Sequence, residues 1–168
     1  MSESDSGPPP AGAISSGSDA RGELRVPAEP AYLALIGSVL RWFGNRAGLS
    51  DEQCRDFEVA LDEACTNVVR YAFAGEARGQ MAVTFCPDAG GLTVEVRDQG
   101  RPFDPKEGAR IAEQKQAQDP ASGGMGLRLM RQLADAVHYR RDEREGNCLT
   151  LTKYKTGRSH DGRRGTHE

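Results

Sequence analysis

The sequence predicts an α+β fold, a two-layer sandwich in which helices cover one face of a mixed β-sheet. Two stretches before residue 75 repeat apolar residues with helical spacing, whereas several other regions alternate polar and apolar residues as strands do. Strands in neighbouring pairs with helices grouped between them are typical of this class. The sequence shows no self-similarity at periods of roughly 20 to 50 residues, so a repeat array is not expected.

Composition narrows the class of protein. The 168 residues carry a formal net charge of −3, which gives no reason to expect direct binding to nucleic acid or an anionic membrane. Residues 1–22 are rich in Ser, Gly and Pro and predict a disordered tail; residues 23–154 predict one domain, and residues 155–168 a flexible C-terminal tail. The longest apolar run is too short to span a bilayer and no secretory signal is evident, so we expect a cytoplasmic protein.

The cysteines are widely scattered, and no two have the spacing of a zinc knuckle or a redox dithiol. We therefore expect reduced cysteines that act as small apolar side chains. They are Cys54, Cys65, Cys86 and Cys148.

The first elements are a strand and two helices. Residues 23–27 alternate polar and apolar side chains and predict a short edge strand that ends at its proline. A helical pattern follows from Tyr32 to Phe43, and Trp42 within it fits either the core or a contact surface. Ser50, with Gln53 three residues later, predicts a capping box that opens the second helix.

The second helix carries the first candidate site. From Phe57 to Tyr71 it presents one apolar stripe, and Glu63 and Asn67 lie four residues apart on the edge of that stripe. A carboxylate and a carboxamide oxygen at such an edge suit Mg²⁺ and a general base. An ordinary core helix with a polar rim explains the same pattern. The stripe consists of Phe57, Ala60, Leu61, Ala64, Val68 and Tyr71.

A hairpin follows, with strands over residues 80–86 and 92–96 and a turn over residues 87–91. Asp98 has the same parity as the apolar residues of the second strand, so its carboxylate is expected to face the apolar side. A buried carboxylate costs several kcal/mol unless something binds it. Either a ligand or a turn cap on the following residues accounts for it.

The remaining chain adds a long polar segment, a glycine cluster and two strands. Residues 103–122 have weak periodicity and predict a functional loop. Residues 123–126 (Gly-Gly-Met-Gly) open a helical pattern, which favours either an anion site at a helix N-terminus or a hinge. Strands through Val137 and Tyr139, and through Leu149 and Leu151, flank a turn predicted at residues 145–147.

Three motifs stand in one order: Glu63-Ala-Cys-Thr-Asn67, Asp98-Gln-Gly-Arg-Pro-Phe-Asp-Pro105, and Gly124-Met-Gly-Leu-Arg-Leu-Met130. Together they resemble the GHKL ATPase superfamily and, more closely, the bacterial anti-sigma-factor serine/threonine kinases. The resemblance covers residues 23–154 and implies the same two-layer fold.

The resemblance also implies roles for these residues. Glu63 would be the general base, Asn67 a ligand of Mg²⁺, and Asp98 the acceptor for the adenine amino group of ATP. Residues 103–122 would form a lid over the nucleotide. Many superfamily members have Gly-Thr where this chain has Gly146-Asn147, and asparagine can still hydrogen-bond to the aspartate. The implied nucleotide-binding residues are Asn67, Asp98, Gly100, Phe103, Gly124, Met125, Gly126 and Leu127.

The implied function is that of a protein kinase and anti-sigma factor. The kinase would phosphorylate a STAS-domain anti-anti-sigma protein, and the same protein would sequester a sigma factor and form a homodimer, through its first strand and helix. A non-catalytic ATP-binding switch in a signalling complex is the alternative. The detached catalytic half of a histidine kinase is disfavoured, because no histidine lies in a dimerising helical hairpin.

Overall fold

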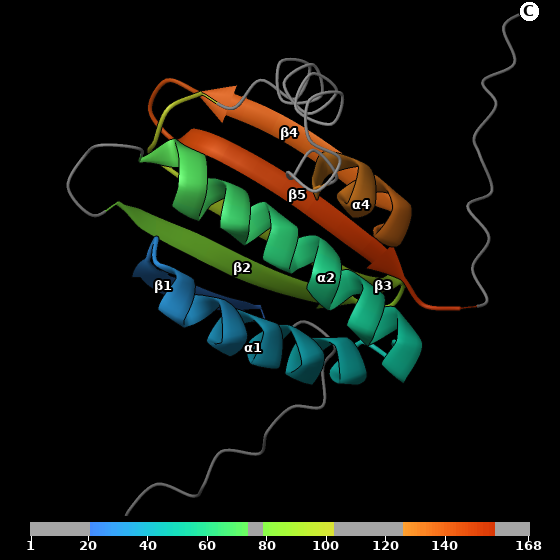
Figure 1. The fold of residues 1–168 in the computed structure, drawn as a ribbon. Helices are drawn as coiled ribbons and strands as arrows, with labels where there is room; N and C mark the ends of the chain where they lie inside the picture. The colour runs from blue at the N-terminus through green and yellow to red at the C-terminus, as the bar shows by residue number, and fades with distance from the viewer. Residues whose placement is uncertain (1–20, 74–78, 103–125, 157–168) are drawn as a thin grey trace, which may run out of the picture.

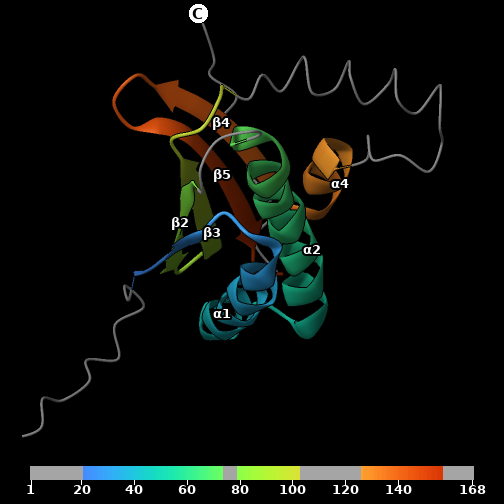
Figure 2. The same cartoon turned by 60° about the vertical axis from the view of Figure 1, so that its left-hand side comes forward.

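The computed structural model describes residues 21–73, 79–102 and 126–156. In this part of the chain, five strands form one sheet in the order β1-β2-β3-β5-β4, with helices packed on one face (Figure 1). Figure 2 shows the two layers edge on, with α1, α2 and α4 on the same side of the sheet. The strands are β1 (Gly22–Pro27), β2 (Gln80–Asp88), β3 (Gly91–Asp98), β4 (Ala136–Asp142) and β5 (Gly146–Tyr154). The helices are α1 (Leu33–Arg46), α2 (Asp51–Asn67) and α4 (Gly126–Leu133).

The predicted α+β two-layer class is confirmed, but the sheet is not mixed. Every strand pairing among the described residues is antiparallel. The placement of the last hairpin explains the difference: β4 runs in the same direction as β3, but β5 lies between them and pairs with both. Alternation in a sequence reports which face of a strand is buried, and not which neighbour the strand takes.

The start of α2 agrees with the sequence. The Gln53 backbone N–H donates to Ser50 Oγ (3.2 Å), and the Ser50 N–H donates to Gln53 Oε1 (3.1 Å), which completes the predicted capping box. Gln53 Nε2 also donates to the carbonyl oxygen of Tyr154 (2.6 Å). The first turn of α2 is therefore tied to the end of β5. α1 is preceded by a short 3₁₀ turn, Pro30–Tyr32.

The core lies between the sheet and the apolar sides of α1 and α2. Its largest fully buried side chains come from both layers, and burying one such side chain contributes about 1.5–3 kcal/mol. This packing holds α2 rigidly across the sheet, where its C-terminal half can carry a site. The largest of these side chains are Phe57, Phe85, Ile36, Leu40, Leu61 and Met81.

The predicted single helix from Phe57 to Tyr71 changes character before it ends. α2 stops at Asn67 and continues as a π-helix, Val68–Ala72. The wider turn of a π-helix adds a residue per turn, so Tyr71 leaves the apolar stripe and is 48% exposed, while Ala72 is buried. The expectation that Tyr71 belongs to the core is corrected. The other five residues of the stripe are buried.

The two hairpin turns differ from the turns that the sequence predicts. The first turn is shorter, and the second lies two residues earlier in the chain. Asp88 Oδ1 accepts hydrogen bonds from the N–H groups of Gly90 and Gly91, so β2 reaches Asp88 and β3 begins at Gly91. Asp142 Oδ1 accepts from the two residues that follow Glu143, which moves the second turn to residues 143–145 and brings Asn147 into β5. In both cases an aspartate side chain fixes the turn locally.

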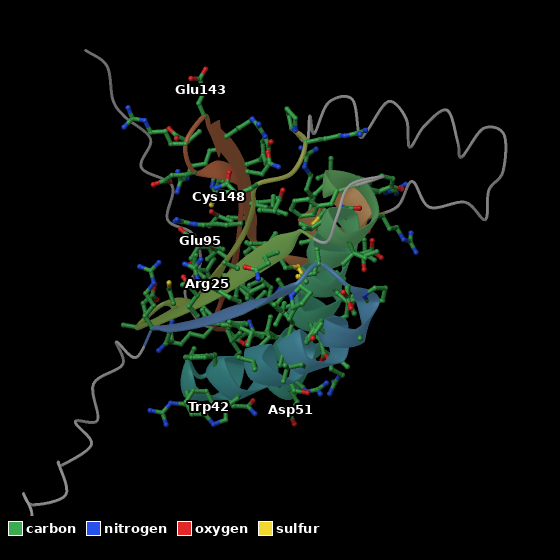
Figure 3. The ribbon with its side chains drawn as sticks, turned by 90° about the vertical axis from the view of Figure 1, so that its left-hand side faces the viewer. Arg25, Trp42, Asp51, Glu95, Glu143 and Cys148 are labelled. Carbon is green, nitrogen blue, oxygen red and sulfur yellow. The ribbon has the colours of Figure 1, made fainter. Side chains whose placement is uncertain are left out.

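Several other expectations concern the outer parts of the domain. β1 is an edge strand, as predicted. Trp42 is 55% exposed and lies on the outer side of α1 (Figure 3). The four cysteines are free thiols, and all but Cys86 are buried. Within the described ranges, none of the helices combines the length and apolar character needed to cross a bilayer.

The predicted tails and lid lie mostly outside the described residues. The domain begins one residue earlier than expected, since Gly22 already pairs with Phe85. At the other end, the N–H of Lys155 donates to the Gly90 carbonyl (2.9 Å), and the Thr156 hydroxyl donates to Gln53 Oε1 (3.0 Å). Residues 1–20, 103–125 and 157–168 remain predictions of the sequence alone.

Candidate functional site

A pocket opens where the C-terminal end of α2 faces the ends of β3, β4 and β5. Asp98 and Asn147 form its buried floor, with 7% and 3% of their surfaces exposed. Tyr71 and Arg101 lie at its more exposed side. It is lined by Ala64, Asn67, Val68, Tyr71, Ala72, Val96, Asp98, Arg101, Pro102, Tyr139, Asn147 and Leu149.

Asp98 is held by two donors on one oxygen. Its Oδ1 accepts a hydrogen bond from the backbone N–H of Gly100 and another from Asn147 Nδ2, both at 2.8 Å. Among the described residues, Oδ2 accepts no hydrogen bond. The turn cap that the sequence offered as one alternative is present on Oδ1, and Oδ2 stays without a donor among the described residues, so the ligand alternative remains a prediction.

Asn147 is the centre of the network. Its Nδ2 also donates to the carbonyl oxygen of Arg101 (2.8 Å), while its Oδ1 accepts from the Tyr139 hydroxyl and from Arg141 Nη1, both at 2.8 Å. A buried carboxamide with partners on both of its atoms is fixed in one orientation. Asn147 thus bonds directly to Asp98, as the sequence analysis expected of an asparagine at this position.

Two effects act in opposite directions on the acidity of Asp98. Burial raises the pKa of its carboxyl group above the usual value, and this is the larger effect. The hydrogen bonds from Asn147 and Gly100 and the positive charge of Arg141 lower the pKa and partly offset the burial. The protonation state of Asp98 therefore depends on its immediate neighbours.

The glycines around this network allow close approaches of the backbone. A Cβ atom at Gly100 would clash with the backbone of Ala72, whose carbonyl oxygen accepts from the Arg101 N–H (2.9 Å). Gly146 has a φ of +78°, and a Cβ there would clash with the carbonyl oxygen of Asp98. Glycine at position 100 lets the loop after β3 pack against the end of the π-helix, and glycine at position 146 lets the start of β5 pack against the end of β3.

The second candidate group lies further along the same side of α2. A Cβ atom placed on Gly126, the first residue of α4, would lie 2.6 Å from Glu63 Oε2 and 3.9 Å from Asn67 Nδ2. Glu63 and Asn67 are both half-buried. Neither side chain has a hydrogen-bond or ion-pair partner among the described residues. The N-terminus of α4 therefore meets a carboxylate and a carboxamide that are both available.

The structure brings together the site residues that sequence reasoning drew from three distant motifs. Asn67 lines the same pocket as Asp98 and also lies beside Gly126, so it links the two groups. Leu127 is partly buried and packs against the core. Phe103, Gly124 and Met125 lie outside the described residues.

Tyr139 and Arg141 are functional candidates that the sequence analysis missed. The sequence pattern predicts Tyr139 only as a strand residue and gives Arg141 no role. The signal was present in the alternation: Arg141 has the parity of Val137 and Tyr139, and although the residue is exposed, its guanidinium reaches Asn147 from the same side of the strand.

A larger hollow, between α1 and α2, contains none of the predicted site residues. It is open to solvent and combines apolar walls with the carboxylates of Glu58 and Asp62. Arg41 already pairs with Glu58 (2.6 Å). Size alone therefore does not select the candidate site, and the polar groups that meet at Asp98, with Glu63 and Asn67 nearby on α2, favour the smaller pocket.

Comparison with known proteins gives a family and several relatives. The Histidine kinase-like ATPase domain family matches residues 26–153, more than half of the chain. The serine-protein kinase RsbW of Bacillus velezensis is 32% identical over 139 residues, which cover 80% of this chain and 86% of the relative. That of Bacillus subtilis is 31% identical over 139 residues, with the same coverage. The one from Listeria monocytogenes serotype 4a is 36% identical over 140 residues, which cover 78% of this chain and 85% of the relative.

Proposed function

The chain belongs to the family of histidine kinase-like ATPase domains, and from this premise we propose that it is an ATP-dependent serine/threonine protein kinase. One observation carries the proposal: the pocket with the buried hydrogen-bond acceptor Asp98 is also lined by Asn67, and Asn67 lies with the available carboxylate of Glu63 beside Gly126. We take the pocket and this neighbouring group as the two ends of one nucleotide cleft. A purine held at the first end would direct its phosphates toward the second.

At the base end, Asp98 Oδ2 accepts a hydrogen bond from the adenine amino group, since Oδ1 is already occupied by two donors. Gly100 allows the loop after β3 to stay close to Ala72 in the π-helix that continues α2, which keeps the base pocket narrow. At the phosphate end, backbone N–H groups at the start of α4 face the transferred group. Gly124, Met125, Gly126 and Leu127 would supply them.

Glu63 acts as the general base. Its carboxylate, adjacent to Gly126, takes the proton of the attacking serine or threonine hydroxyl as the oxygen forms its bond to the γ-phosphorus. The bond between the γ-phosphorus and the bridging oxygen breaks in the same step, and ADP leaves with that oxygen. Phosphoryl transfer needs little else from the protein beyond positioning and charge neutralisation. The proton on Glu63 then leaves to solvent.

The residues present fit Mg²⁺. Asn67 Oδ1 and the nearby Glu63 carboxylate are hard oxygen donors without partners among the described residues, and a side chain at position 126 would fill the space beside them. Within the described ranges, no group of three or more His, Cys, Asp or Glu side chains could hold a metal alone. Asn67 would therefore share the ion with phosphate oxygens and water. When bound, the ion neutralises charge on the phosphates.

The protein substrate is a STAS-domain anti-anti-sigma protein, and the kinase also sequesters a sigma factor until that antagonist displaces it. The named relatives support the kinase part of this proposal, because each is called a serine-protein kinase. A surface shared by the two partners near the cleft would let nucleotide state bias the choice between them.

The protein forms a homodimer through β1 and α1. In the described residues β1 is an edge strand, with one side unpaired. The outer side of α1 adds exposed apolar surface, since Leu35 and Trp42 are 47% and 55% exposed. The protein acts in the cytoplasm, where its four free thiols would stay reduced.

The test is phosphate transfer to a defined acceptor. The full chain is incubated with Mg²⁺ and γ-labelled ATP and a panel of STAS domains, each paired with a copy whose acceptor serine is replaced by alanine. Label on one STAS domain, absent from its alanine copy, supports the kinase. Tight ATP binding with no transfer to any STAS domain would instead favour a non-catalytic switch. Calorimetry that detects no binding of any adenine nucleotide would exclude both functions.

A further inference from the structure

The orientation of the Asn147 carboxamide is fixed by a donor group on one side and an acceptor group on the other. Arg141 is a donor only, so the Asn147 atom that faces it must be the oxygen. The carbonyl of Arg101 is an acceptor only, so the atom that faces it must be the nitrogen. The same nitrogen therefore donates to Asp98.

This orientation decides where a proton on Asp98 can be. Oδ1 of Asp98 receives N–H donors from both Gly100 and Asn147, so it has no place for a hydrogen of its own. If Asp98 is protonated, the hydrogen must be on Oδ2, which then becomes a donor. If Asp98 is ionised, Oδ2 is an acceptor only.

The two states of Oδ2 select different bases. An acceptor matches the exocyclic amino group of a 6-amino purine and opposes the carbonyl oxygen of a 6-oxo purine, and a donor does the reverse. A site whose buried polar group meets the wrong partner loses affinity strongly. Selection between the two purine classes thus depends on what keeps Asp98 ionised.

We propose that Tyr139 and Arg141 are specificity-determining residues that set the preference of the cleft for a 6-amino over a 6-oxo purine. They act by holding Asn147 so that it donates to Asp98, and Arg141 adds its positive charge; Arg141 is a positioning residue that does not line the pocket. The inference rests on the proposed function only in that the cleft binds a purine nucleotide.

Charge around Asp98 supports this assignment. Burial raises the pKa of Asp98, and Arg141 is the charged side chain that lowers it. Arg101 lies in the loop that follows β3, while Arg144 and Glu145 border a hollow on the other side of Asp98. From α2, among the described residues, the pocket receives only uncharged side chains. Loss of Arg141 therefore favours the protonated form of Asp98.

The experiment measures dissociation constants of the full chain for ATP and for inosine triphosphate, both with Mg²⁺, by calorimetry at several pH values between about 6 and 8. Inosine triphosphate carries oxygen where ATP carries the amino group. The variants are Arg141→Gln and Tyr139→Phe. The matched control is Arg140→Gln, which removes the same charge from the adjacent residue, paired with Glu145 (3.3 Å) away from the pocket.

In Arg141→Gln we expect the preference for ATP over inosine triphosphate to fall about ten-fold at the lowest pH measured and to recover in part as the pH rises and Asp98 ionises. Tyr139→Phe should lower the preference about three-fold, and Arg140→Gln should leave it within about two-fold of the unmodified chain.

Equal weakening of both nucleotides in Arg141→Gln and Tyr139→Phe, with an unchanged ratio, would mean a merely structural role and would overturn the inference. The same conclusion follows if Arg140→Gln changes the ratio as much as Arg141→Gln does. If the unmodified chain binds neither nucleotide, the proposed function fails as well. Nucleotide binding with an unchanged ratio leaves the proposed function intact and rejects only this inference.

Discussion

The two ends of the cleft differ in how completely the described residues satisfy their polar groups. At the base end, Asn147 uses both atoms of its carboxamide and Asp98 has one oxygen saturated. At the phosphate end, neither Glu63 nor Asn67 has a partner within the described residues. At the base end, therefore, the polar side-chain atoms of Asn147 and Asp98 are hydrogen-bonded except for Asp98 Oδ2. At the phosphate end, the polar side chains have no partners among the described residues.

The difference matches what each end must do. A base pocket discriminates between similar molecules, so its groups are fixed before the ligand arrives. A transfer site has to admit a metal ion, phosphates and a protein hydroxyl, and its groups gain their partners only then. Substitutions at the base end should therefore change binding, whereas substitutions at the phosphate end should change the transfer rate.

The largest expected effect is at the phosphate end. Glu63→Gln should reduce the rate of phosphoryl transfer about 10²- to 10⁴-fold, because a carboxamide does not accept the hydroxyl proton. ATP affinity should stay within about three-fold, since Glu63 does not line the pocket that holds Asp98. Single-turnover transfer and calorimetry measure the two quantities.

Asp62→Asn is the matched control, because Asp62 is the adjacent carboxylate on α2 and lines the hollow toward α1 instead. It should transfer phosphate at nearly the normal rate. A Glu63→Gln variant as fast as this control would show that the base is another group.

The next largest effect is at the base end. Asp98→Asn should weaken ATP binding roughly 100-fold or more, because the amide that replaces Oδ2 would point a donor at the adenine amino group. Its Oδ1 can still accept from Gly100 and Asn147, so the fold should survive.

The same variant should be more stable than the unmodified chain at neutral pH. Burial raises the pKa of Asp98 in the folded state, so its contribution to stability is present below the unfolded pKa, about 3.9, and is lost as pH rises through the folded pKa. Asparagine does not ionise. The unfolding temperature of Asp98→Asn relative to the unmodified chain should therefore rise between about pH 4 and pH 7 in thermal melts. A relative decrease would contradict the burial argument.

Local sequence patterns predict some of the site residues and not others. The inward Asp98 and the pairing of Glu63 with Asn67 follow from periods of two and 3.6 residues, which are local properties of strands and helices. The capping box at Ser50 is local too, and it is found where predicted.

The rest depends on contacts between distant segments. Placing β5 between β3 and β4 puts Asn147 beside Asp98, and no local pattern specifies that order. The π-helix that turns Tyr71 outward is likewise associated with a tertiary contact, where the loop after β3 meets Ala72. Sequence reasoning therefore found the chemical groups and missed part of the network that orients them.

A glycine-to-alanine substitution at each end of the cleft tests the difference between the base end and the phosphate end. At Gly100 an added Cβ would meet the backbone of Ala72, which cannot move without disturbing the π-helix. Gly100→Ala should lower the free energy of unfolding by about 1–3 kcal/mol and weaken ATP binding with it. Denaturant titration gives the first quantity. An unchanged midpoint would mean that the loop after β3 is not held against α2.

At Gly126 the close contact of the added Cβ among the described residues would be with the end of the Glu63 side chain, 2.6 Å away, and a carboxylate can rotate. Alanine is also the better helix former, so Gly126→Ala should leave the free energy of unfolding within about 0.5–1 kcal/mol or increase it. Because the displaced group is the base, transfer should slow about ten-fold with nearly unchanged ATP affinity. A variant that lost stability but not rate would behave like Gly100→Ala, and the distinction between a rigid base end and an adaptable phosphate end would then be wrong.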